Sequence, residues 1–134
     1  MIYFLDNTFS KQMAEILRML KVEAIHLQEE YAAETKDADW IPEVALKGYT
    51  LITGDGRIRK GSAERAALEQ SQLPAIFLYN GYTNTTIWEQ VAFLVRHWPV
   101  IEKEARKMQS GDTRYLGVNG NITTYEALAA KRKK

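Results

Sequence analysis

The stretch that decides the fold is MIYFLDN, residues 1–7, a short apolar run that ends in a carboxylate. Its apolar residues predict a buried strand, and Asp6 follows where that strand would give way to a helix. A second segment repeats this arrangement: YTLIT, residues 49–53, precedes Gly54 and Asp55. In an open α/β sheet, ligands bind outside the carboxyl ends of the strands. We therefore expect Asp6 and Asp55 to share one site.

The residues between these two strands predict a helix and another strand. A helix is expected over 10–20, a strand over 22–27, and a polar loop over 28–36. The next helix contains Pro42, which fits best in a first turn, so Asp39 or a neighbour is the expected cap. Gly48 is expected to stop that helix. This alternation of strands and helices predicts an α/β fold with a mostly parallel, doubly wound sheet.

The second half of the chain continues the alternation. Ser62 is expected to cap a helix that reaches Ser71, and a strand is expected over 75–79. A long helical pattern covers 85–109, where Pro99 should kink or divide the helix. The last feature is a β-hairpin around Asn119-Gly120, formed by residues 115–118 and 122–125.

Composition limits the class of protein. With 134 residues, 46% of them hydrophobic, the chain has the size of one domain with a substantial core. We place that domain at 1–126 and expect the basic end, 127–134, to be a solvated, disordered tail. The chain has no cysteine, which excludes thiol chemistry and is typical of the reducing cytoplasm. No apolar run approaches the roughly 18 residues of a membrane span, so no membrane partner is expected.

Acidic residues stand where strands end or helices begin. These are Asp6, the pair Asp37 and Asp39, and Asp55. Oxygen ligands at such points suit Mg²⁺ or Mn²⁺, which retain waters and bind through a few carboxylates and substrate phosphates. The reaction that such a site supports is metal-assisted hydrolysis of a phosphodiester. The alternative is that each aspartate has only a structural role, as a helix cap or a turn residue.

Basic residues follow the second of these strand ends. Arg57, Arg59 and Lys60 come directly after Asp55 and could hold a polyanionic backbone. Glu64 lies in the first turn of its helix, where the helix dipole favours a carboxylate. It is therefore expected more as a cap-region residue than as a fourth ligand. The sequence contains no phosphate loop, dinucleotide fingerprint or serine-hydrolase motif.

Several motifs together resemble the PIN-like nuclease domain. They are FLDN before a helix, an IHL run in the second strand, DADWIPEVA at 37–45, and TLITGDGRIR at 50–59. The later SAERAAL segment, the AIFL strand and the long helix are similar too, so that the resemblance covers roughly residues 2–110. The most similar branch is that of the VapC-like toxins of prokaryotic toxin–antitoxin pairs. The resemblance implies a three-layer α/β/α fold with a cluster of acids at the carboxyl edge of the sheet.

The resemblance also implies roles for single residues. Asp6 and Asp55 would bind Mg²⁺ or Mn²⁺, and Asp37 or Asp39 would supply a third carboxylate. We favour Asp39 as this third ligand. Asp37 would then support the ligands without touching the metal, or it would replace Asp39 as the ligand. Asn7 stands where many members have a second acid and is assigned to the substrate side of the site. Glu64 is the candidate for the fourth acid that typical members have.

The expected function is therefore a metal-dependent ribonuclease, acting as a toxin that an antitoxin protein inhibits. Trp88 and Trp98 could support a homodimer interface. One alternative is a non-catalytic module with the same fold that binds protein or RNA, because the fourth acid has no clear match. A second alternative is a nuclease that cuts DNA, since nothing in the sequence recognises a 2′-hydroxyl.

Overall fold

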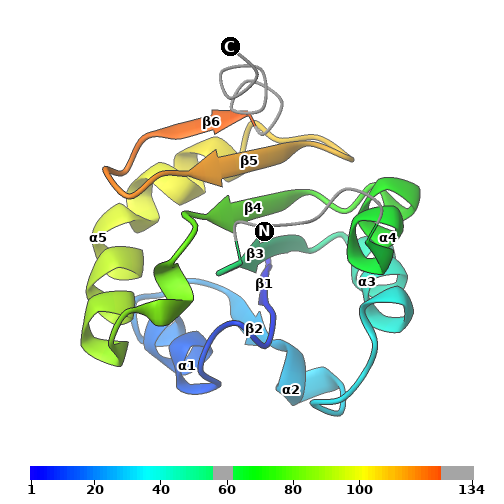
Figure 1. Cartoon of the computed structure of the whole chain (residues 1–134), viewed down its shortest axis with the longest axis horizontal. Coiled ribbons are helices and arrows are strands. Elements are labelled where there is room, and N and C mark those ends of the chain that lie inside the picture. Colours follow the sequence, from blue (N-terminus) through cyan, green and yellow to red (C-terminus); the bar gives the residue numbers. More distant parts are fainter. Residues whose placement is uncertain (56–61, 125–134) are drawn as a thin grey trace.

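The computed structural model describes residues 1–55 and 62–124, which form alternating strands and helices around one sheet (Figure 1). The strands are β1 (Tyr3–Leu5), β2 (Ala24–His26), β3 (Thr50–Thr53), β4 (Ala75–Leu78), β5 (Thr113–Leu116) and β6 (Ile122–Thr124). The helices are α1 (Gln12–Met19), α2 (Leu27–Glu30), α3 (Asp37–Leu46), α4 (Ala63–Ser71) and α5 (Ile87–Ala105), with a 3₁₀ turn, η1, at Tyr82–Asn84. None of the helices within these ranges has the length and apolar character needed to cross a membrane.

The six strands form one sheet in the order β2-β1-β3-β4-β5-β6. Neighbours pair in parallel from β2 to β5, and β6 alone runs antiparallel to β5. The predicted α/β class and the predicted hairpin are therefore both confirmed. Gly120 in the hairpin turn has a φ of +86°, which a residue without Cβ adopts at little cost.

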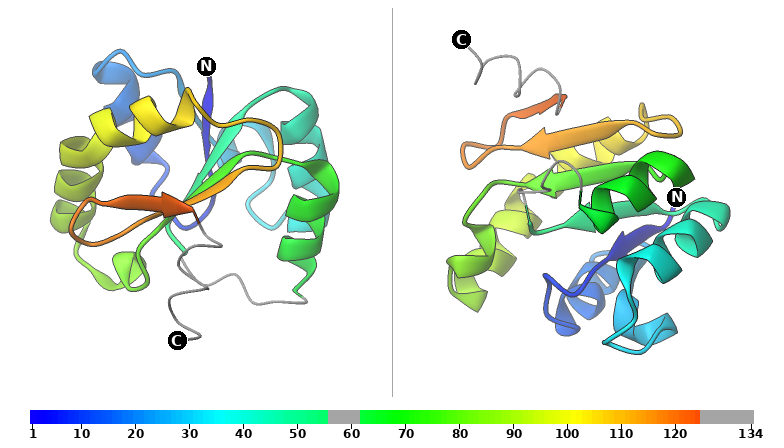
Figure 2. Two further views of the ribbon diagram at one scale, coloured as in Figure 1. Left: turned by 90° about the horizontal axis from the view of Figure 1, so that it is seen from above. Right: turned by 45° about the vertical axis from the view of Figure 1, so that its right-hand side comes forward.

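Helices cover both faces of the sheet, giving three layers (Figure 2). Helices α1 and α5 pack on one face, together with Tyr3, Leu5 and the other inward residues of that side. Helices α3 and α4 pack on the opposite face, which includes Phe4 and Phe77. Successive strand residues alternate between the two cores, as the pleat of a sheet requires. Because both faces are covered, the central strands β1, β3 and β4 are buried throughout, and this explains their mainly apolar runs in the sequence.

The order of the strands places a switch point between β1 and β3. From β1 the chain passes through α1 to β2 on one side, then through α3 to β3 on the other side of β1. The helix that follows β1 and the helix that follows β3 consequently lie on opposite faces. In this class of fold, ligands bind outside the carboxyl ends of the strands at such a switch point.

The segment after β2 differs from the prediction. The expected polar loop over 28–36 begins with the short helix α2, because His26 and Glu29 cap it. The His26 Nδ1 atom accepts from the Gln28 N–H at 3.0 Å, and a Glu29 carboxylate oxygen accepts from the His26 N–H at 2.8 Å. The other ring nitrogen lies 2.9 Å from the Phe9 carbonyl oxygen, so both nitrogens of the buried imidazole have hydrogen-bond partners within the fold.

Helix α3 begins three residues earlier than a cap at Asp39 would give. Lys36 occupies the cap position rather than Asp39, and Pro42 lies inside the helix. Pro42 has no backbone N–H that could donate to the carbonyl of Ala38. Ala38 is exposed, so water can bind this carbonyl instead. Burial of Trp40, Ile41 and Val44 stabilises the helix despite this loss. Gly48, with a φ of +76°, ends the helix as predicted.

Helix α5 is continuous through Pro99, so the predicted division into two helices is wrong. Its seam of buried residues runs from Leu94 to Ala105, whereas Ile87 is half exposed at the start of the helix. Trp98 belongs to this seam and packs edge-on against Tyr3 at 4.8 Å between ring centroids. Trp98 is thus a core residue and not the interface residue that the sequence suggested.

Helix α4 begins as predicted. The Ser62 hydroxyl accepts from the Arg65 N–H at 3.1 Å, which satisfies an amide that has no partner within the helix. Ala67 and Leu68 are buried on the side of α4 that faces the sheet, and Ala66 is exposed.

Candidate acidic site at the switch point

Asp6 follows β1 at the switch point and is almost completely buried, with 7% of its surface exposed. Its Oδ1 atom accepts hydrogen bonds from the backbone N–H of Thr8, at 3.1 Å, and from the Thr8 hydroxyl. Burial raises the pKa of the Asp6 carboxyl; hydrogen bonds from Thr53 and Thr8 oppose this shift, and the charge of Asp37 adds to it. Among the described residues, these hydrogen bonds do not fully offset the effect of burial.

Thr8 connects the loop after β1 with the end of β3. Its hydroxyl donates to Asp6 and accepts from the Gly54 N–H at 2.6 Å. A Cβ atom at Gly54 would lie 3.0 Å from the Thr8 hydroxyl oxygen and 3.1 Å from the Tyr82 ring. Glycine at position 54 thus permits the close approach of the two loops that place Asp6 and Asp55.

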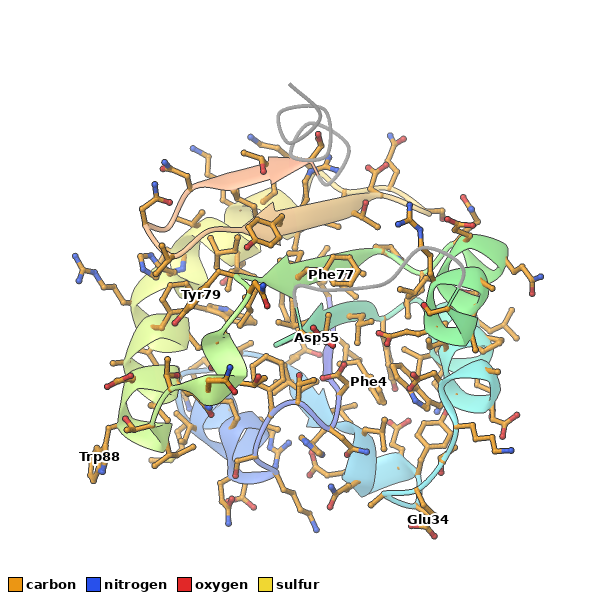
Figure 3. The ribbon with its side chains drawn as sticks, viewed as in Figure 1. Phe4, Glu34, Asp55, Phe77, Tyr79 and Trp88 are labelled. Atoms are coloured by element: carbon orange, nitrogen blue, oxygen red, sulfur yellow. The ribbon has the colours of Figure 1, made fainter. Side chains whose placement is uncertain are left out.

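Asp55 follows β3 and lies in the middle of the molecule in the view of Figure 3, below Phe77 of β4. It is half-buried, and its N–H donates to the hydroxyl of the fully buried Thr53 at 3.3 Å. The side chain of Thr53 also bonds Asp6. The two aspartates predicted to share a site are therefore linked through Thr53 as well as through Thr8.

Glu64, in the first turn of α4, faces the same edge. Burial raises its pKa to about 7, with further contributions from the charges of Asp37, Asp6 and Asp55. Only nearby charges act in this way, so the helix starts of α3 and α4 bring their acids to the ends of β1 and β3. Glu64 is thus the acid on which the charges of Asp6, Asp37 and Asp55 all act.

Of the two acids in the first turn of α3, the structure brings Asp37 into this group. Asp37 is half-buried and interacts with Asp6 and Glu64, whereas Asp39 is exposed and does not affect the pKa of either. The Asp37 Oδ1 atom accepts from the Trp40 indole N–H at 3.1 Å. The sequence allowed either aspartate, since their order along the chain does not show which one faces the sheet.

The other residues assigned from sequence contribute differently. Asn7 is exposed and bound on both sides: its Nδ2 donates to the Ala33 carbonyl at 2.7 Å, and its Oδ1 accepts from Gln28 at 3.0 Å. Asn7 thus ties the β1 loop to the loop after α2. Arg57, Arg59 and Lys60, assigned to substrate binding, lie outside the described residues.

Sequence analysis missed Thr8, Thr53 and Trp40. A threonine two residues after an aspartate is a common local hydrogen-bonding pattern, so Thr8 had a weak signal. Trp40 stands three residues after Asp37, the spacing at which helical side chains meet. Thr53 had no signal beyond its place at the end of a strand.

The donor set fits a hard divalent cation. Within residues 1–55 and 62–124, no Lys or Arg forms an ion pair with Asp6, Asp37 or Glu64. In the same ranges, no three Asp, Glu or His side chains converge tightly enough to enclose an ion. Mg²⁺ needs no such enclosure, because it commonly takes one or two carboxylates and completes its shell with waters.

The fold and the site define a three-layer α/β protein with a carboxylate cluster at the switch point of a parallel sheet. A family model described as a PIN-like domain matches residues 1–80, more than half of the chain, and includes all four acids. The chain belongs to the PIN-like domain family, whose members are generally nucleases. Neither the comparison with curated proteins nor the comparison with solved structures returned a match.

Proposed function

We propose that the protein is a metal-dependent endoribonuclease whose active site consists of Asp6, Asp37, Asp55 and Glu64. The observation that supports this most strongly is that the charges of Asp6, Asp37 and Asp55, which follow β1, begin α3 and follow β3, all raise the pKa of Glu64 in the first turn of α4. Membership of the PIN-like domain family supports the nuclease class. Asp37 replaces Asp39, the ligand first favoured from sequence, because Asp37 is the acid near Asp6 and Glu64.

The proposed cofactor is Mg²⁺ or Mn²⁺. Asp6 and Asp55 would hold the cation directly, and Asp37 and Glu64 would hold it directly or through water. When bound, the cation would stabilise charge on the phosphate oxygens and activate a water for attack. The chain itself orients Asp6, whose carboxylate accepts hydrogen bonds from Thr8 and Thr53.

The choice of RNA and the biological role rest on the resemblance to VapC-like toxins. We propose a toxin that an antitoxin protein inhibits, acting in the cytoplasm as such toxins do. Expression of the wild-type chain should then arrest growth of a bacterial host, and the Asp6→Asn variant should not. Normal growth with active, folded nuclease present would contradict the toxin role while leaving the nuclease in place.

Cleavage of a mixed RNA pool by the purified full chain tests the catalytic proposal. We expect cutting in Mg²⁺ or Mn²⁺, none in EDTA, and at least a 100-fold loss of rate in Asp6→Asn and in Asp55→Asn, because each substitution removes a charge that holds the cation. Asp39→Asn is the matched control and should retain activity within about twofold. A DNA pool run in parallel shows which nucleic acid is cut.

The other outcomes are equally specific. A folded protein that binds RNA but cuts nothing in any metal would indicate the non-catalytic module. Cutting of DNA alone would replace RNA as the substrate. Cutting that persists in both aspartate variants would place the active site elsewhere.

A further inference from the structure

Trp40 is a buried residue next to the proposed site, and the reaction gives it no role. It is 1% exposed and is among the largest fully buried side chains of the described chain. A buried indole N–H without an acceptor costs free energy, because an unpaired polar group in a core loses its hydrogen bonds to water. The Trp40 N–H has one: it donates to Asp37 Oδ1 at 3.1 Å.

Aromatic packing fixes this indole relative to β1. The Trp40 ring lies 5.3 Å from the Phe4 ring, centroid to centroid, and Phe4 also contacts Tyr31 and Tyr49 at 6.2 Å each. Phe4 is two residues before Asp6 in the same strand. The position of the indole is therefore set by the strand that also places Asp6.

The hydrogen bond distinguishes between the two acids of α3. Helical residues three apart lie on the same face, whereas adjacent residues do not. Asp37 is three residues before Trp40 and can accept from its N–H, but Asp39 is adjacent to Trp40 and is directed to solvent. Occupation of one Asp37 oxygen also leaves the other oxygen for a ligand.

We propose that Trp40 is a positioning residue: its N–H holds Asp37 and thereby selects it, rather than Asp39, as the metal-binding acid of α3. This inference rests on the proposed function. Partners of this kind, which hold a ligand in its binding orientation, typically change metal affinity by 10–100-fold when removed.

A double-mutant cycle on Mn²⁺ affinity, measured by isothermal titration calorimetry of the full chain, tests the proposal. Trp40→Phe retains an aromatic ring and removes the N–H, and it should weaken Mn²⁺ binding about tenfold. In an Asp37→Asn background the same substitution should change the affinity less than about twofold, because the carboxylate it orients is absent. Trp88→Phe, at an 84% exposed tryptophan, is the matched control and should have no effect.

An NMR measurement on the wild-type protein provides a second test that does not depend on the folding of variants. The Trp40 indole proton resonance should shift on titration with Mg²⁺, and the Trp88 indole resonance should not. An unchanged Trp40 resonance at saturating Mg²⁺ would contradict the proposal.

The possible outcomes distinguish failure of the proposed role of Trp40 from failure of the proposed nuclease function. Equal weakening by Trp40→Phe in both backgrounds would mean that Trp40 acts through packing, and the inference would be wrong although the metal site stands. Absence of Mn²⁺ binding by the wild-type chain would overturn the metal-dependent nuclease itself and the inference with it.

Discussion

Thr8 shows at the scale of one residue how the proposed site is held together. Its hydroxyl donates to a buried carboxylate and accepts from the backbone of the loop that leads to Asp55. A hydrogen bond to a charged group contributes about 1.5–3 kcal/mol, more than a bond between neutral groups. Thr8 should therefore matter for stability as well as for the placement of the acids.

Thr8→Val tests this, because it retains the shape of the side chain and removes the hydroxyl. We expect the free energy of unfolding at pH 8 to fall by about 2 kcal/mol in urea denaturation, since the Gly54 N–H and Asp6 both lose a partner. Thr8→Ser retains the hydroxyl and should cost less. Equal stability of the Val and Ser variants would show that the two hydrogen bonds contribute nothing.

Glu64 should make the stability of the metal-free protein depend on pH. Its pKa is about 7 in the folded protein and 4.5 ordinarily, so the folded state binds more protons between these values. The free energy of unfolding contributed by this group is then highest below pH 4.5 and declines as pH rises through 7. A neutral side chain at position 64 should therefore prevent this decline in the free energy of unfolding.

The expected result for Glu64→Gln in EDTA is a gain of about 2 kcal/mol over wild type at pH 8, and a much smaller difference at pH 4. Urea denaturation at the two pH values measures it. Glu43→Gln, at an exposed glutamate of α3, should show neither effect. A Glu64→Gln variant no more stable than wild type at pH 8 would argue against a strained acidic cluster.

At the scale of elements, α5 presents one buried seam against the sheet. Leu94 is fully buried, whereas Ile87, two turns earlier on the helix, is 50% exposed. Leu94→Ala should lower the free energy of unfolding by about 2–5 kcal/mol, because it removes buried contacts and leaves a cavity. Ile87→Ala should cost less than about 1 kcal/mol.

Chemical denaturation of both variants distinguishes these values. Similar small losses for Leu94→Ala and Ile87→Ala would mean that α5 does not dock on the sheet as described.

The seam is also the reason that α5 continues through Pro99, since packing on both sides of the proline compensates for the missing backbone hydrogen bond.

Elements with a strong local signal were predictable from sequence. The strands at 2–5 and 49–53, the Ser62 cap and the hairpin at Asn119-Gly120 depend on patterns within a few residues. Helix boundaries at α2 and α3 were not predictable, because they depend on bonds to His26 and on burial of Trp40. Propensity rules placed Pro42 in a first turn, and tertiary packing overrode them.

At the scale of the whole molecule, the strand order creates the site. That Asp6 and Asp55 follow adjacent parallel strands agrees with the sequence, because each comes directly after an apolar run. The choice of Asp37 over Asp39, and the inclusion of Glu64, depended on how α3 and α4 sit on the face of the sheet. Spacing along the chain contains no information on that arrangement.

The most direct test of the central claim is an NMR titration of the Glu64 side-chain carboxyl, without metal and with saturating Mg²⁺. The claim is that four acids form one coupled site that a divalent cation neutralises. We expect a pKa of about 7 without metal and a pKa near or below the ordinary 4.5 with Mg²⁺, because the cation offsets burial and the charges of Asp37, Asp6 and Asp55. A pKa near 4.5 under both conditions, or one near 7 that Mg²⁺ does not change, would contradict the claim.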